Sequence, residues 1–272
     1  MITGIFSRTY AAKGDAVFAA IKADGFSAAQ LNLSSLGLES LPAWLPEEII
    51  LSAKAVAHRH GIQLVALSGT YNMAHPDLEY RQEQRAKFAN VVRAAQLLGI
   101  GVVSLCTGSR DANHMWAHHV ENNSSEAWKD FRSELDAALT LAEGLTLVIE
   151  PELGNVVRDA TVAHKLLKDV GSPHLKIILD AANLLSPQTL PQQHAIMAEA
   201  FQLLGDSVVL AHAKDIDAQG HVVQPGLGAI DLPRFVSGLK QIGFKGAVVA
   251  HGFEEKDARA AGLFLNSLVK SN

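Results

Sequence analysis

The sequence predicts a single α/β domain folded as a (β/α)8 TIM barrel, and three observations lead to this prediction. Short apolar runs, each of a length typical of a strand buried on both faces, alternate with longer segments of helical character. Such alternation favours a parallel sheet. The length of 272 residues fits one barrel of ~250 residues, and no linker-like stretch marks an internal boundary. We therefore expect one domain over residues 1–272.

Eight strand-like segments can be identified from their apolar character and their flanking turn residues. The expected strands are Ile2–Ser7, Ala28–Leu33, Ile62–Gly69, Gly101–Gly108, Thr146–Glu150, Lys176–Asp180, Val208–His212 and Ala247–His251. The helices expected after them are Asp15–Asp24, Pro46–Gly61, Leu78–Leu98, Ser125–Glu143, Thr161–Val170, Pro191–Leu204, Leu232–Ile242 and Asp257–Val269. Eight such units satisfy barrel closure. An open doubly wound sheet would need a glycine-rich phosphate loop after the first strand, and SRTYAAKG does not provide one.

Composition and charge limit the kinds of molecule that the protein is expected to bind and the compartment in which it is expected to act. The formal net charge of −5 argues against a nucleic-acid surface, which needs a basic face. The single cysteine, Cys106, excludes an internal disulfide and fits a reducing compartment. The N-terminal segment lacks the pattern of a signal peptide, and no window approaches 18 uninterrupted apolar residues. We expect a cytoplasmic protein with no nucleic-acid or membrane partner.

The last four expected strands each end on a residue that can bind a metal ion. These residues are Glu150, Asp180, His212 and His251. A closed parallel barrel brings the C-terminal ends of its strands to one rim, so the four can converge on one ion. Two carboxylates and two imidazoles suit Mn²⁺, Zn²⁺, Co²⁺ or Fe²⁺ better than Ca²⁺, and we expect Mn²⁺ first, with Mg²⁺ as a further candidate. Any one of these residues could simply cap the loop that follows its strand. Four such residues at the same position of four strands are less readily explained in this way.

Several segments together resemble a known superfamily. They are the run Glu150-Pro151-Glu152, the strand end at Asp180, the run His212-Ala213-Lys214-Asp215, the run from Gln224 to Asp231, and the final strand GFKGAVVA. In order and spacing they resemble the xylose-isomerase-like superfamily of TIM barrels. This superfamily includes sugar and sugar-phosphate isomerases and epimerases, inosose and dehydroshikimate dehydratases, and type 2 AP endonucleases. The resemblance implies a divalent ion held by Glu, Asp, His and Glu from the last four strands.

Two positions depart from that pattern. His251 stands where the resemblance implies a second glutamate, and Asn183 stands where many members have histidine. In sugar epimerases the first and last glutamates also transfer the proton on either face of the substrate carbon, and here only Glu150 remains. We expect Glu150 to act as metal ligand and base. His251 could be the fourth ligand or the second acid/base.

Further polar residues near strand ends are candidates for binding substrate. They are Arg8, Asn72, Arg110, Asn183, Lys214 and Glu255. Either arginine could bind an anionic group, although lone arginines more often form surface or supporting ion pairs. Strand alternation places Lys214 on the same side as His212, facing the pocket, and a salt bridge to Asp215 or to a neighbouring helix is the alternative. Asn72 could bind a hydroxyl group or serve only the turn, and Glu255 could restore a carboxylate to the rim.

These features favour a metal-dependent isomerase or epimerase that acts on a small sugar, keto-sugar or sugar phosphate through an enediolate. A metal-dependent lyase or dehydratase on a keto-sugar or cyclitol shares the first proton abstraction, so the sequence does not separate the two. A non-catalytic sugar-binding barrel is also open, because His251 replaces a catalytic carboxylate. AP endonuclease activity is less favoured, since the histidines of its trinuclear zinc site have no equivalents. The resemblance is compatible with a homodimer or homotetramer, with Trp44 and Trp116 as candidate interface residues.

Overall fold

The computed structural model describes residues 1–270 and forms a closed eight-stranded parallel barrel, which confirms the predicted fold class. The last two residues of the expected domain, 271–272, lie outside the described residues. The barrel strands are β1 (Ile2–Phe6), β2 (Ala28–Leu31), β3 (Gln63–Ser68), β4 (Val102–Leu105), β5 (Thr146–Ile149), β6 (Leu175–Asp180), β7 (Val208–Ala213) and β10 (Ala247–Ala250). Around the barrel they follow the order β1-β10-β7-β6-β5-β4-β3-β2.

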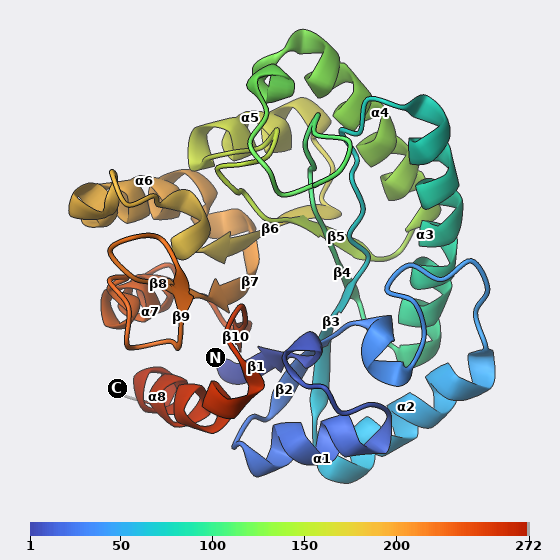
Figure 1. Cartoon of the computed structure of the whole chain (residues 1–272), viewed down its shortest axis with the longest axis vertical. Coiled ribbons are helices and arrows are strands. Elements are labelled where there is room, and N and C mark those ends of the chain that lie inside the picture. Colours follow the sequence, from blue (N-terminus) through green and yellow to red (C-terminus); the bar gives the residue numbers. More distant parts are fainter. Residues whose placement is uncertain (271–272) are drawn as a thin grey trace.

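Helices surround the strands in a ring, and the last helix returns the chain to the side of β1 (Figure 1). They are α1 (Asp15–Ala23), α2 (Glu47–His60), α3 (Leu78–Leu98), α4 (Ser125–Leu141), α5 (Ala160–Val170), α6 (Gln193–Leu204), α7 (Leu232–Gln241) and α8 (Ala258–Lys270). Gly61 and Gly99 adopt the left-handed conformation directly after α2 and α3, as the predicted helix ends require. In the described residues 1–270, no helix is long and apolar enough to cross a membrane.

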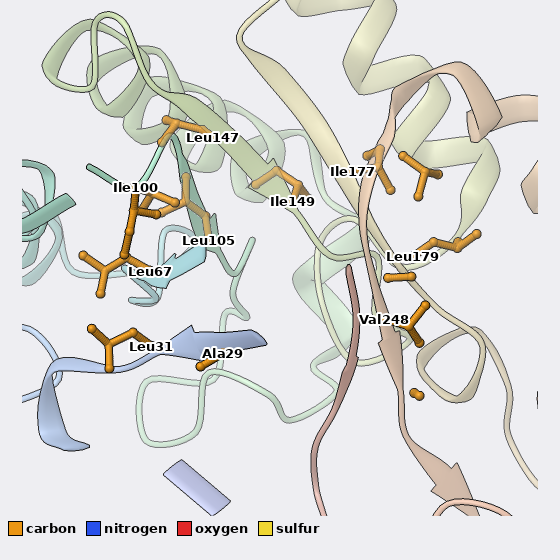
Figure 2. Packing of buried hydrophobic residues seen from close by; sticks show 14 of the residues in the cluster. Ala29, Leu31, Leu67, Ile100, Leu105, Leu147, Ile149, Ile177, Leu179 and Val248 are labelled. Carbon is orange, nitrogen blue, oxygen red and sulfur yellow. The ribbon is translucent and has the colours of Figure 1, made fainter. Parts of the chain in front are cut away.

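Side chains of the strands alternate between two apolar layers. One layer packs between barrel and helices and includes Leu147, Ile149, Ile177, Leu179 and Val248, all fully buried (Figure 2). Burial of each Leu or Ile contributes about 1.5–3 kcal/mol. The residues between them in sequence face the barrel interior instead.

The inner layer fills the barrel directly below its C-terminal mouth. It contains Val148, Ile178, Leu210 and Val249, which are at most 2% exposed. Since side chains on one face of a strand recur every two residues, the next inward-facing positions lie at the mouth. On these four strands those positions hold Glu150, Asp180, His212 and His251. The apolar inner layer therefore fixes the direction in which the four polar side chains point.

The loop after β7 contains a short hairpin that we did not predict. Strands β8 (Asp215–Ile216) and β9 (Val222–Val223) pair antiparallel, and each is too short to give a recognisable sequence pattern. The buried Asp215 carboxylate accepts hydrogen bonds from the backbone N–H groups of Gly226, Gly228, Ile230 and Ile216. Asp215 therefore organises this loop, and it forms no salt bridge with Lys214 within the described chain.

Candidate functional site

The C-terminal mouth of the barrel opens into a cavity of about 500 Å³. Its polar lining consists of Arg8, Gln30, Asn32, Ser40, Ser68, Thr70, Ser104, Glu150, Glu152, Asn183, His212, Lys214 and His251. Its apolar lining includes Phe6, Leu105, Met115, Trp116 and Val222. This mixture of apolar walls and convergent polar groups is typical of a site for a small polar ligand.

Four side chains at this mouth form a group that could hold a metal ion. One ligand atom from each of Glu150, Asp180, His212 and His251 lies within 4.8 Å of the others. Asp180 and His212 are paired in register on β6 and β7, whereas Glu150 and His251 directly follow β5 and β10. The side chains are only 0–16% exposed, which shields them from bulk water.

Hydrogen bonds already link the four side chains in pairs. His212 Nδ1 lies 2.8 Å from Glu150 Oε1, and His251 Nε2 lies 2.9 Å from Asp180 Oδ2. The two imidazole rings are tilted by 56° with their centroids 4.4 Å apart. Two oxygen and two nitrogen donors so close together fit a borderline divalent ion such as Mn²⁺ or Zn²⁺.

Burial and pairing act in opposite directions on the pKa values of this group. Burial favours the neutral form of Glu150, but its pKa is lowered because the His212 imidazole outweighs burial. Burial would also lower the pKa of His212, and the Glu150 carboxylate raises it instead. The pKa of Asp180 is lowered by its bond to His251, which overcomes burial. Burial and the nearby His212 lower the pKa of His251.

A residue that the sequence analysis missed orients His212. Gln30, on β2, accepts a hydrogen bond from His212 Nε2 at 2.7 Å, and its own amide Nε2 donates to Ser104 Oγ at 3.1 Å. This arrangement turns His212 Nδ1 toward Glu150 and the candidate metal position. Partners that fix the ring orientation and tautomer of a ligating histidine tune metal affinity. The signal in the sequence is a glutamine inside the otherwise apolar run AAQL.

A second chain of hydrogen bonds connects Lys214 to the same group. Lys214 Nζ donates to Asn183 Oδ1, and Asn183 Nδ2 donates to Glu150 Oε1 at 2.8 Å. Both Lys214 and Asn183 line the pocket, as does Glu152, which the sequence analysis did not select as a site residue. Burial, followed by the neighbouring Glu150 charge, raises the pKa of Glu152 to about 7.

Three of the predicted substrate-binding residues lie outside the lining of the pocket. Asn72 is buried and bonds to the backbone of Ser109 through both its amide nitrogen and its oxygen. Arg110 is buried in an ion pair with Asp130 at 2.6 Å. Glu255 accepts the backbone N–H of Ala11 at 2.8 Å. These groups are occupied in holding loops, whereas Arg8, Asn183 and Lys214 reach the pocket.

The long loop after β4 contributes Met115 and Trp116 to the pocket wall. It is held against the loop after β5, because Asn155 Nδ2 donates to the Met115 carbonyl oxygen at 3.0 Å. Gly154 is needed for this contact, since a Cβ atom there would lie 2.4 Å from the Trp116 carbonyl oxygen. His114 and His118 are exposed residues of this irregular loop and lie outside the pocket lining.

The family to which the chain belongs follows from a comparison with family models. The model described as xylose isomerase-like TIM barrel matches residues 18–268. The chain belongs to this family. No curated protein matches the chain.

Several solved structures share this barrel at low sequence identity. D-psicose 3-epimerase from Clostridium cellulolyticum H10, solved with D-tagatose, is 17% identical over 100% of both chains, with a TM-score of 0.75. The 3-keto-D-glucoside 4-epimerase YcjR from E. coli is 17% identical over 98% of this chain and 99% of its own, with a TM-score of 0.77. The IOLI protein with a bound zinc atom is 18% identical over 99% of this chain and 98% of its own, with a TM-score of 0.73. At these identities the likeness establishes the fold.

Proposed function

We propose that the protein is a metal-dependent isomerase or epimerase that acts on a small sugar, keto-sugar or sugar phosphate. The observation that carries the proposal is the group Glu150, Asp180, His212 and His251 at the mouth of the barrel, beside a cavity of about 500 Å³. A cavity of this volume accommodates a ligand of sugar size. The names of the epimerases that share the fold support the same reaction class.

The residues of the site suit proton transfer next to a carbonyl group. A divalent ion held by the four side chains would polarise a carbonyl and its neighbouring hydroxyl, with Mn²⁺ favoured over Zn²⁺, Co²⁺, Fe²⁺ or Mg²⁺. Glu150 lines the pocket and is the candidate base: its carboxylate would accept the proton from the substrate carbon, leaving an enediolate. His251 completes the ligand group and is the candidate for returning a proton from the β10 side.

Substrate hydroxyl groups have partners on the remaining wall of the pocket. Ser68, Thr70 and Ser104 line it from the side of β3 and β4, and Asn183 and Lys214 line it next to Glu150. Phe6 and Trp116 supply apolar surface for the carbon face of a sugar ring.

The first experiment measures metal content and proton exchange on the same preparations. Mass spectrometry should find near-stoichiometric transition metal in the native protein and none in the Glu150→Ala/His212→Ala variant. The exposed pair Glu143→Ala/His174→Ala is the matched control and should keep the metal. Metal-loaded native protein should then exchange a carbon-bound proton of one ketose with deuterated water, as followed by NMR.

The same experiment separates the alternatives. Absence of metal in the native protein, even after reconstitution, would remove the basis of the proposal. Exchange accompanied by loss of a hydroxyl group would identify a lyase or dehydratase. Tight binding of one sugar without any exchange would identify a sugar-binding barrel.

A further inference from the structure

Arg8 is an exposed arginine that lines the pocket. It follows β1 and lines the cavity, yet its guanidinium has no hydrogen-bond or ion-pair partner within residues 1–270. Glu255 is held near this segment by the N–H of Ala11, three residues beyond Arg8, but makes no ion pair with it. The five donors of Arg8 are therefore available to a ligand.

The carboxylates of the pocket lie on the side opposite Arg8. In the closed strand order, β1 is four places from β5, so Arg8 stands across the mouth from Glu150 and Glu152. Asp180 adds a third carboxylate next to these two, on β6. A ligand that reaches from Glu150 across the cavity would meet Arg8 at its far end.

With a divalent ion bound, the group of Glu150, Asp180, His212 and His251 would not repel an anionic ligand. Two ionised carboxylates and two imidazoles neutral as metal ligands would carry a charge of −2, which the ion would cancel. His251 contributes to this balance because it adds a ligand atom without adding a negative charge. The strand that carries His251, β10, also lies directly beside β1 and thus next to the segment that carries Arg8.

Lys214 is the second cation of the pocket, but its surroundings differ. Its ammonium group donates to Asn183, which in turn donates to Glu150. Its aliphatic stem lies along Gly252, where an added Cβ atom would come within 3.2 Å of Lys214 Cδ. Lys214 is thereby fixed close to Glu150, whereas Arg8 follows β1, four places from β5 in the barrel.

We propose that the substrate carries an anionic group, a carboxylate or a phosphate, at the end remote from Glu150, and that Arg8 binds it. A guanidinium matches the two oxygens of either anion with parallel hydrogen bonds. The inference rests on the proposed function, since it assigns the substrate class of the same pocket. It narrows that class from sugars in general to keto-sugar acids or keto-sugar phosphates.

The test uses unreactive polyols that differ only in the anion, so that binding is measured without turnover. Calorimetry on the metal-loaded protein compares D-glucitol, D-gluconate and D-glucitol 6-phosphate. At least one anionic probe should bind about tenfold or more tightly than D-glucitol, because a hydrogen bond to a charged group changes affinity by this order. The tighter of the two anions identifies carboxylate or phosphate as the natural group.

Two variants decide whether Arg8 is responsible. Arg8→Gln should abolish the preference for the anionic probe, while Arg259→Gln, which removes one exposed positive charge from α8, should retain it. Equal binding of all three probes, no binding of either anion, or a preference that persists in Arg8→Gln would overturn the inference. Metal content and proton exchange report separately on the proposed function, so one proposal can fail without the other.

Discussion

In both halves of the barrel mouth, side chains at or near the C-terminal ends of strands face the pocket, but the two halves carry different kinds of side chain there. Strands β5, β6, β7 and β10 end in ionisable side chains that bond to each other, as in the Glu150–His212 pair. Strands β2, β3 and β4 present amide and hydroxyl groups to the same pocket, namely Gln30, Ser68 and Ser104. The second half of the chain thus supplies the four ionisable side chains that could hold a metal ion, whereas these three strands of the first half supply amide and hydroxyl groups.

One hydrogen bond joins the two halves. Gln30 and His212 are 182 positions apart in sequence, yet their side chains meet at 2.7 Å. A residue of β2, Gln30, therefore orients His212, which belongs to the ionisable group on the opposite strands. Three substitutions test this arrangement: the first changes Glu150 in the ionisable group, and the other two change the residues of β2 and β4 that support His212.

The largest effect is expected from Glu150→Gln. The amide keeps the size of the side chain but cannot accept the substrate proton, so turnover should fall by about 10³-fold. Single-turnover proton exchange on metal-loaded protein measures this loss. Glu143→Gln, on an exposed turn, is the control. Retention of more than about a tenth of the native rate would assign the base elsewhere, with Glu152 as the next carboxylate of the pocket.

A smaller effect is expected from Gln30→Leu. Loss of the acceptor for His212 Nε2 should free the imidazole and weaken metal affinity by about 10–100-fold. Competition with a chelating dye gives the affinity directly. Gln241→Leu changes an exposed glutamine at the end of α7 and should leave it unaltered. An unchanged affinity in Gln30→Leu would mean that the two halves act independently.

The smallest effect is expected from Ser104→Ala. This change removes the acceptor of the Gln30 amide but leaves the bond to His212 in place. A neutral hydrogen bond contributes about 0.5–1.5 kcal/mol, so metal affinity should fall by less than about tenfold. The exposed Ser237→Ala provides the baseline in the same dye competition. A loss as large as that of Gln30→Leu would show that Ser104 controls the orientation of the glutamine.

Strand ends were the most predictable part of the molecule. A buried parallel strand leaves an apolar run, and the first polar residue on its inward face then marks the mouth. Glu150, Asp180, His212 and His251 were all selected on this ground, and the structure brings them within reach of one ion. The alternation of side chains along a strand also predicted that Lys214 faces the same side as His212, and Lys214 does line the pocket.

Loop residues and residues within strands were harder to assign. Asn72 and Arg110 lie close to strand ends in sequence, but irregular backbone turns Asn72 toward the loop at Ser109 and Arg110 toward Asp130 on α4. The direction of a loop side chain depends on partners distant in sequence, such as Asp130 for Arg110, which periodicity does not reveal. Gln30 was missed for a different reason, because its importance lies in a bond to the opposite half of the chain.

The apolar layer of Val148, Ile178, Leu210 and Val249 has a consequence for the order of events at the site. It separates Glu150, Asp180, His212 and His251 from the opposite end of the barrel, so an ion and a substrate would share one entrance. If the substrate covered the ion, the ion would have to enter first and could leave only after the substrate. Bound substrate should therefore slow extraction of the ion by a chelator, and excess substrate should slow reconstitution of the apoprotein.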